Sequence, residues 1–139
     1  MNDRINKKKT ILIAFRKPGD ADQLVHILSK EDYRVIKAQN FLGLIESLEN
    51  YHIDLMVSEV ALPGVSMFYF LPFLRKRYSD IKVIIAMKNY SPRAELLLRP
   101  YKVMYFLQWP ADHSLLTSII KAGLEARDTV YSDKYILSQ

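Results

Sequence analysis

The chain has no cysteine, only four glycines and a single tryptophan among its 139 residues. Without cysteine it can form neither a disulfide framework nor a thiolate zinc site. The scarcity of glycine, with no glycine-rich phosphate loop, argues against a dinucleotide site. No apolar run reaches the length of a membrane span, and the run at residues 10–15 is too short for a secretory signal. We therefore expect a cytoplasmic protein without a cofactor.

Patterns that carry catalysis or metal binding are missing as well. The three histidines, His26, His52 and His113, are dispersed along the chain. No nucleophile lies in a motif with a base, and no acidic or histidine residues have the spacing of metal ligands. The sequence therefore predicts neither an enzyme nor a metal site.

The composition is that of one globular domain of ordinary size, since half of the residues are hydrophobic and a quarter are charged. The net charge is +5, and much of the excess is local, at residues 7–9 and 75–77. Such patches can attract phosphate backbones or acidic partners. No nucleic-acid recognition motif accompanies them. We interpret them as solvated surface plus a flexible basic leader, and we consider a nucleic-acid partner unlikely.

Short apolar runs alternate with amphipathic segments along the chain. The expected strands are residues 11–14, 33–38, 53–58, 81–87 and 102–107. Asp20 or Asp22 is expected to cap the first helix and Asn40 the second, and the last helix is expected to follow Asp112. Strands that alternate with helices indicate an α/β fold, in which helices cover both faces of a parallel sheet.

The segment after the third expected strand contains a proline within an otherwise helical pattern. Pro72 follows Met67 and several aromatic residues. Proline in a helix interior costs about 3 kcal/mol, but it costs little in the first turn. We therefore expect the helix to begin near Leu71 or to kink there, which would leave residues 67–70 as an aromatic-rich bulge.

Residues 54–64 read Asp-Leu-Met-Val-Ser-Glu-Val-Ala-Leu-Pro-Gly, and Trp109-Pro110 follows the fifth expected strand. These landmarks and their spacing resemble the receiver domain of bacterial response regulators. The resemblance covers residues 10–127, which leaves a leader at 1–9 and an extension at 128–139. It implies a flavodoxin-like, doubly wound sheet of five parallel strands with order 2-1-3-4-5. It also implies a cis peptide bond before Pro110.

In receiver domains an acidic pair holds Mg²⁺, an aspartate accepts a phosphoryl group, and a hydroxyl and a lysine contact that group. The matching positions here carry Phe15 and Arg16, Glu59, Met87 and Trp109. Mg²⁺ prefers oxygen ligands, which Phe15 and Arg16 lack. The extra methylene of Glu59 moves its carboxylate by about 1.5 Å, enough to disturb a site that needs close alignment. The resemblance thus implies a degenerate receiver without phosphotransfer.

The replaced residues allow more than one interpretation. Phe15, Met87 and Trp109 can fill the former polar pocket, or they can line an apolar ligand crevice together with Met67 and Phe68. Glu59 needs a partner if it is buried, and Arg16 and Lys88 are the natural candidates for an ion pair. Glu59 can also be incidental, or act as a permanent mimic of the charged state.

By resemblance, partners and dimers would use the fourth helix, fifth strand and fifth helix of the receiver fold, here residues 92–99, 102–107 and 112–127. The interface candidates are Arg93, Arg99, Tyr101 and Tyr105. Lys102 replaces a turn glycine, so the turn is expected to differ. Phe106 holds the position of the switch aromatic, and we expect it in a single rotamer because Met87 lacks a hydroxyl.

These observations favour a phosphorylation-independent, receiver-like signalling module of a bacterial regulatory system. It would act by binding protein partners, and it could form a homodimer. One alternative is a module that senses a small ligand in an apolar pocket at the carboxyl ends of the strands. Another is an atypical phosphoreceiver that uses Glu59.

Overall fold

The computed structural model describes residues 8–125. Most of the expected leader and the whole expected extension, at residues 1–7 and 128–139, lie outside the described residues. The first strand already begins at Lys9, the last residue of the expected leader.

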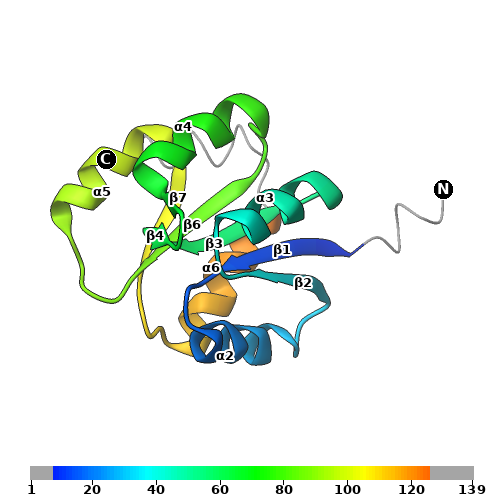
Figure 1. The fold of residues 1–139 in the computed structure, drawn as a ribbon. Coiled ribbons are helices and arrows are strands. Elements are labelled where there is room, and N and C mark those ends of the chain that lie inside the picture. Colours follow the sequence, from blue (N-terminus) through cyan, green and yellow to red (C-terminus); the bar gives the residue numbers. More distant parts are fainter. Residues whose placement is uncertain (1–7, 126–139) are drawn as a thin grey trace.

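The core is a five-stranded parallel sheet with the order β2-β1-β3-β6-β7 (Figure 1). The strands are β1 (Lys9–Ala14), β2 (Tyr33–Ala38), β3 (Leu55–Glu59), β6 (Lys82–Met87) and β7 (Val103–Gln108). They are rich in apolar residues because both faces of the sheet are covered. The order confirms the predicted flavodoxin-like arrangement 2-1-3-4-5.

Helices cover both faces of the sheet, as predicted (Figure 1). Two of them, α2 (Pro18–Leu28) and α6 (His113–Glu125), pack on one face with Ile11 and Ile13. The other three, α3 (Phe41–Asn50), α4 (Met67–Arg77) and α5 (Pro92–Leu98), pack on the opposite face with Leu12 and Ala14. Successive strand residues point to opposite faces of the sheet, so one short apolar run contributes side chains to the hydrophobic cores on both faces.

The start of α3 confirms the predicted cap by Asn40, and the last helix follows Asp112 as predicted, with a hydrogen bond to the Asp112 side chain that the sequence did not indicate. Asn40 Oδ1 accepts the Gly43 N–H at 2.8 Å, and Asp112 Oδ2 accepts the Leu115 N–H at 3.0 Å. The predicted cap by Asp20 or Asp22 is wrong. The N-cap of α2 is Lys17, without a side-chain cap bond, because Pro18 already has the fixed φ that suits the first helical position.

The expected late start of the third helix is also wrong. α4 begins at Met67, where Ser66 Oγ accepts the Phe68 N–H at 3.2 Å, and it contains Pro72. A short hairpin that the sequence did not indicate, β4 (Ala61–Leu62) and β5 (Val65–Ser66), places Ser66 at this cap. Four buried side chains of α4 offset the cost of the proline, since each contributes about 1.5–3 kcal/mol on burial.

The basic cluster at residues 75–77 contains a structural residue. The Arg75 guanidinium donates to four carbonyls: Tyr101 at 2.7 Å, Ile81 at 2.6 Å, Lys102 at 3.1 Å and Ser79 at 3.3 Å. Burial lowers the pKa of Arg75, and the charge of Asp80 partly offsets this effect. Arg75 therefore joins the end of α4 to the start of β6 and to the turn before β7.

That turn is the one predicted to differ at Lys102. A 3₁₀ turn, η1 (Arg99–Tyr101), follows α5, and Lys102 then adopts φ 61°. This is the left-handed conformation that favours glycine. The lysine thus adopts a glycine-like backbone at this position, and the expected difference of this turn from that of receiver domains stays a prediction.

The Trp109–Pro110 peptide bond is cis, as predicted. Within residues 8–125, no helix is both long enough and apolar enough to cross a membrane.

Candidate functional site at the carboxyl edge of the sheet

The predicted site residues lie at the carboxyl ends of neighbouring strands. Phe15 and Arg16 follow β1, Glu59 ends β3, Met87 ends β6, and Trp109 follows β7. Parallel strands end at the same edge of a sheet, which is the usual position of a ligand crevice in open α/β folds. The contacts at that edge of this chain include one between aromatic rings and two between polar groups.

The aromatic contact joins the chain after β1 to the chain after β7. Phe15 and Trp109 are both buried, with ring centroids 5.1 Å apart and ring planes at 65°. The Trp109 backbone N–H also donates to the Met87 carbonyl at 2.8 Å. Edge-to-face pairs of this kind contribute about 0.5–1.5 kcal/mol beyond their buried area. The two rings occupy space where the resemblance places an acidic residue and a lysine.

Glu59 makes its contact with a backbone group. Its Oε1 accepts the Arg16 N–H at 2.6 Å. The preceding N–H, that of Phe15, still bonds to Ala38 across the sheet, so Arg16 is the first residue past the strand ladder. The predicted ion pair of Glu59 with the side chains of Arg16 and Lys88 is wrong. Glu59 binds the backbone amide of Arg16, and Lys88 pairs with a different carboxylate.

That carboxylate belongs to Asp20, which sequence reasoning treated only as a cap. Lys88 Nζ lies 2.7 Å from Asp20 Oδ2, and the two side chains are 38% and 21% exposed. The hydrogen bond from Lys88, helped by one from the Trp109 side chain and by the charge of Lys17, outweighs burial and lowers the pKa of Asp20. The sequence could have indicated a role for Asp20 at this site, because the first turn of the helix after β1 lies at the same edge of the sheet as the strand ends.

The residues at this edge do not fit a magnesium ion. Mg²⁺ demands near-octahedral oxygen coordination, and Phe15 and Arg16 bring no oxygen ligand from their side chains. The carboxylates that are present, Glu59 and Asp20, already bind an amide and an ammonium group. In the described part of the chain, no three acidic or histidine side chains come together as a metal site.

The five residues predicted to line a ligand crevice lie on opposite faces of the sheet. Phe15 and Trp109 pack with α2 and α6, whereas Met67, Phe68 and Met87 pack with α3, α4 and α5. The five side chains therefore pack in two separate clusters, and a shared ligand crevice stays a hypothesis. A hollow of about 450 Å³ lies between α2 and α6, and its lining residues include none of these five.

The predicted interface candidates lie around α5 and β7. Tyr105 and Arg93 are exposed, whereas Arg99 and Tyr101 are half-buried. Phe106 is also half-buried and packs in the same cluster as Met87. Sequence reasoning missed two further apolar residues of α5, Leu96 at 71% and Leu97 at 47% exposure. The run of three leucines at 96–98 could have indicated them, because a helix cannot bury three consecutive side chains on one face, and here Leu98 is the one that is buried.

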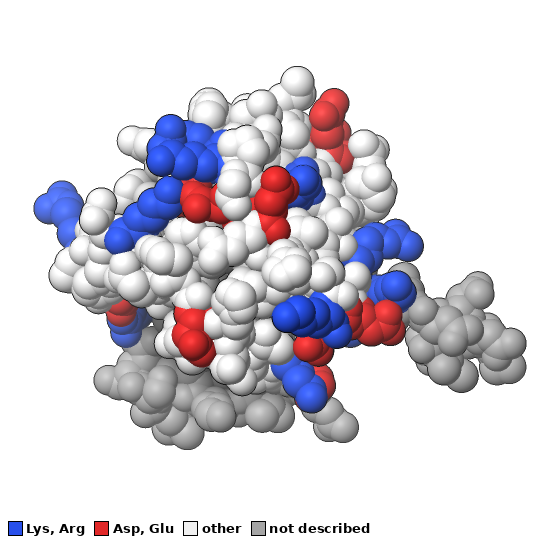
Figure 2. All heavy atoms as spheres, turned by 90° about the horizontal axis from the view of Figure 1, so that it is seen from below, with Lys and Arg blue, Asp and Glu red and all other residues white. Residues whose placement is uncertain are grey.

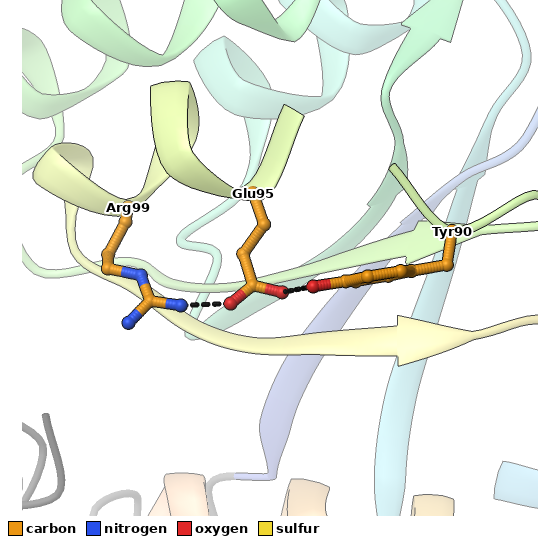
Figure 3. A network of polar contacts seen from close by, with 3 residues as sticks. All are labelled: Tyr90, Glu95 and Arg99. Carbon is orange, nitrogen blue, oxygen red and sulfur yellow. Dashed lines mark hydrogen bonds and ion pairs between the residues drawn. The ribbon is translucent and has the colours of Figure 1, made fainter. Parts of the chain in front are cut away.

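A polar network fixes the side chains on one side of α5 (Figure 3). The Tyr90 hydroxyl donates to Glu95 Oε1 at 2.5 Å, and Arg99 pairs with the other carboxylate oxygen. The hydrogen bond to Glu95 raises the pKa of Tyr90. Arg99, a predicted contact residue that follows α5, is thus held by Glu95 of that helix.

Charges of both signs lie side by side on the face drawn in Figure 2, which is seen from below the view of Figure 1. On this part of the surface the excess positive charge of the chain is not gathered into one basic field. Among residues 8–125, lysine and aspartate side chains also form direct pairs, Lys37 with Asp22 at 3.0 Å and Lys8 with Asp32 at 3.3 Å.

No protein-family model and no curated protein match this chain. The solved structures do contain similar folds. A CheY-like response regulator receiver domain protein from Methanospirillum hungatei has a TM-score of 0.80 at 22% identity, over 86% of this chain and 95% of the other. A two-component response regulator from Clostridium difficile has a TM-score of 0.81 at 16% identity, over 87% and 99%.

A signal receiver domain of an HD domain-containing protein from Pseudomonas fluorescens has a TM-score of 0.81 at 18% identity. That match covers 86% of this chain and 96% of the other. At these identities the likeness concerns the fold. The chain has the fold of CheY-like response regulator receiver domains.

Proposed function

We propose that this protein is a receiver-like signalling module that works without phosphorylation and acts by binding a protein partner. The observation that carries the proposal is the state of Glu59. Its carboxylate, at the position of the phosphoryl acceptor, already accepts the Arg16 N–H at 2.6 Å. Phosphotransfer needs the attacking oxygen aligned with the incoming group, and here a backbone amide fixes one of the two carboxylate oxygens of the longer side chain.

The surroundings of Glu59 support the same proposal. Phe15 and Trp109 fill the neighbouring space with two buried rings, and Met87 is buried at the end of β6. None of these side chains carries an oxygen that could hold Mg²⁺. The one lysine of the edge that contacts a carboxylate, Lys88, is paired with Asp20 at 2.7 Å. We propose no reaction for this site.

The partner surface in this proposal is formed by α5, β7 and α6. Leu96, Leu97 and Tyr105 are exposed there, and Arg93 adds a cation beside them. Exposed aromatic and arginine side chains are enriched at protein interfaces, and the two leucines add apolar surface beside them. Because Glu95 holds Arg99 and Tyr90, part of this surface is already ordered before a partner binds.

The first test is phosphorylation with a small-molecule donor. We expect no phosphoryl adduct in the intact mass after incubation with acetyl phosphate or phosphoramidate and Mg²⁺. A receiver domain with an aspartate acceptor serves as the positive control. The variant Glu59→Asp should also stay unmodified, because Phe15, Met87 and Trp109 remain. An adduct on Glu59 in the native chain would contradict the proposal and support an atypical phosphoreceiver.

The second test concerns the partner surface. We expect Leu97→Ser and Tyr105→Ala to weaken capture of the native partner at least tenfold, since buried interface anchors carry most of the binding energy. Tyr51→Ala, an exposed tyrosine at the end of α3, is the matched control and should have little effect. Glu59→Gln should change binding less than twofold. A folded Glu59→Gln variant that no longer binds would mean that Glu59 acts as a charge mimic.

A further inference from the structure

The helices α3 and α4 are joined by a row of aromatic rings. The Phe41 and Phe70 centroids are 6.3 Å apart at 84°, and the Phe70 and Phe73 centroids are 5.5 Å apart at 45°. Phe41 begins α3, whereas the other two belong to α4. Both helices follow a strand of the same parallel sheet, so they run in the same direction over one face (Figure 1). Their N-terminal halves therefore share one aromatic surface.

Much of this surface faces outward. Tyr69 is 83% exposed and Leu42 is 66% exposed, and about half of Phe41 and Phe73 is also exposed. Tyr69 and Phe73 lie one turn apart on α4, so their rings are neighbours. Scattered apolar side chains are normal on a protein surface, but a contiguous group on two adjacent helices indicates a contact site.

The C-terminal halves of the same helices carry opposite charges. Glu46 and Glu49 are exposed on α3, and Lys76 and Arg77 are exposed on α4. The spacing of these residues from Leu42 and Phe73 places them on the same outward faces. Within residues 8–125, Glu46, Glu49 and Lys76 make no ion pair, while Arg77 lies over the Tyr78 ring at 5.5 Å.

This arrangement is complementary to itself. A two-fold axis that runs parallel to α3 and α4, midway between them, places α3 of one copy against α4 of the other. Aromatic halves then meet aromatic halves, and the acidic end of each α3 meets the basic end of each α4. A two-fold axis perpendicular to the helices within the interface would instead oppose apolar and charged halves. We propose that a second copy of this chain docks on the α3–α4 face and forms an isologous dimer.

The size of the α3–α4 face limits the expected affinity of the dimer. Helices of 10 and 11 residues are about 15 Å long, so the contact is small beside the roughly 800 Å² per partner of a stable interface. The dimer is therefore weak and reversible, in the micromolar range. It uses α3 and α4 and leaves the α5–β7–α6 surface of the proposed function free.

The test is sedimentation equilibrium of the full chain from low to high micromolar concentration. We expect a monomer–dimer equilibrium in the native chain. Leu42→Glu and Phe73→Glu should raise the dissociation constant at least tenfold. Leu96→Glu on α5 is the control and should leave it unchanged. Circular dichroism checks that each variant is folded.

The charge exchange tests the orientation of the two copies. Glu49→Lys alone and Lys76→Glu alone should each weaken the dimer several-fold, and the double variant should restore it to within about threefold, because the two sites then exchange signs. A native chain that is monomeric throughout the range would overturn the proposal. A dimer that Leu96→Glu disrupts and the α3 and α4 variants do not would overturn it as well.

Discussion

At the scale of single residues, the carboxyl edge of the sheet holds its charges in positions that differ from those the resemblance implies. Trp109 stands where a lysine is implied, and Lys88 at the end of the neighbouring strand supplies an ammonium group instead. Phe15 stands where a carboxylate is implied, and Asp20 in the first turn of α2 supplies one. The result is an ion pair joining a helix to a strand, beside a buried pair of rings.

The Asp20–Lys88 contact should stabilise the fold in a pH-dependent way. Asp20→Asn should lower the free energy of unfolding by about 0.5–1 kcal/mol at neutral pH, a modest value because both side chains are partly exposed. The pKa of Asp20 is lowered in the folded state. The contribution is therefore complete above the unfolded carboxyl pKa of about 3.9, and it is lost as the pH falls through the folded value.

Urea unfolding at neutral and acidic pH measures this difference. Asp22→Asn is the matched control, because the Asp22–Lys37 pair is at least half exposed on both sides and should contribute less. Trp109 is the only tryptophan, so its emission reports directly on the Asp20 site. An Asp20→Asn variant whose deficit persists unchanged at acidic pH would show that the charge of Asp20 is not what stabilises the fold.

Glu59 should act through its acceptor oxygen alone. Glu59→Gln keeps a carbonyl that can accept the Arg16 N–H, so we expect a loss of about 1 kcal/mol or less. Glu59→Ala leaves that N–H without its partner and should cost about 1–3 kcal/mol. Chemical denaturation compares the two variants. Equal losses in both would argue against a role for the hydrogen bond.

At the scale of elements, Arg75 holds together segments that are distant in the sequence. Its guanidinium reaches carbonyls before β6 and before β7 from the end of α4. Arg75→Met removes these donors and leaves buried carbonyls unsatisfied, so we expect a loss of about 2–3 kcal/mol in the free energy of unfolding. Arg93→Met, an exposed arginine of α5, should change it by less than about 0.5 kcal/mol.

The turn before β7 makes a separate prediction. Lys102 has φ 61°, a conformation that costs a residue with a side chain about 1 kcal/mol more than glycine. Lys102→Gly should therefore raise stability by roughly 0.5–1 kcal/mol, whereas Lys102→Val should lower it. Thermal unfolding measures both. A destabilised Lys102→Gly variant would mean that the lysine side chain outweighs the backbone cost.

At the scale of the whole molecule, the proposed function predicts one state of the α5–β7–α6 surface. Phe106 packs in the same cluster as Met87, so we expect its ring to keep a single rotamer. A switch needs a ligand that prefers one of two states, and in the proposed function no phosphoryl group binds at the carboxyl edge. Adding Mg²⁺ and beryllofluoride should leave the amide NMR shifts of this surface unchanged. A saturable shift around Phe106 would show that the switch survives.

Much of the fold could be predicted because its signals are local. Apolar runs of strand length, separated by helical patterns, indicate a parallel sheet without any knowledge of contacts. Asn40 was predicted as a cap because an N-cap acts on an amide three residues ahead. Pro72 misled the prediction because its local cost is offset by burial, which depends on the rest of the fold.

The sequence alone therefore determined the fold class and the alternation of strands and helices, and it places Phe15, Arg16, Glu59, Met87 and Trp109 where the resemblance implies the receiver-type side chains. Only the tertiary structure decided which groups meet at the carboxyl edge. The Arg16 amide binds Glu59, and Asp20 takes Lys88, although Arg16 and Lys88 both looked like partners of Glu59. The physical reason is that backbone donors have no identity in the sequence, and a pairing between distant charges depends on distances that the packed sheet and helices set.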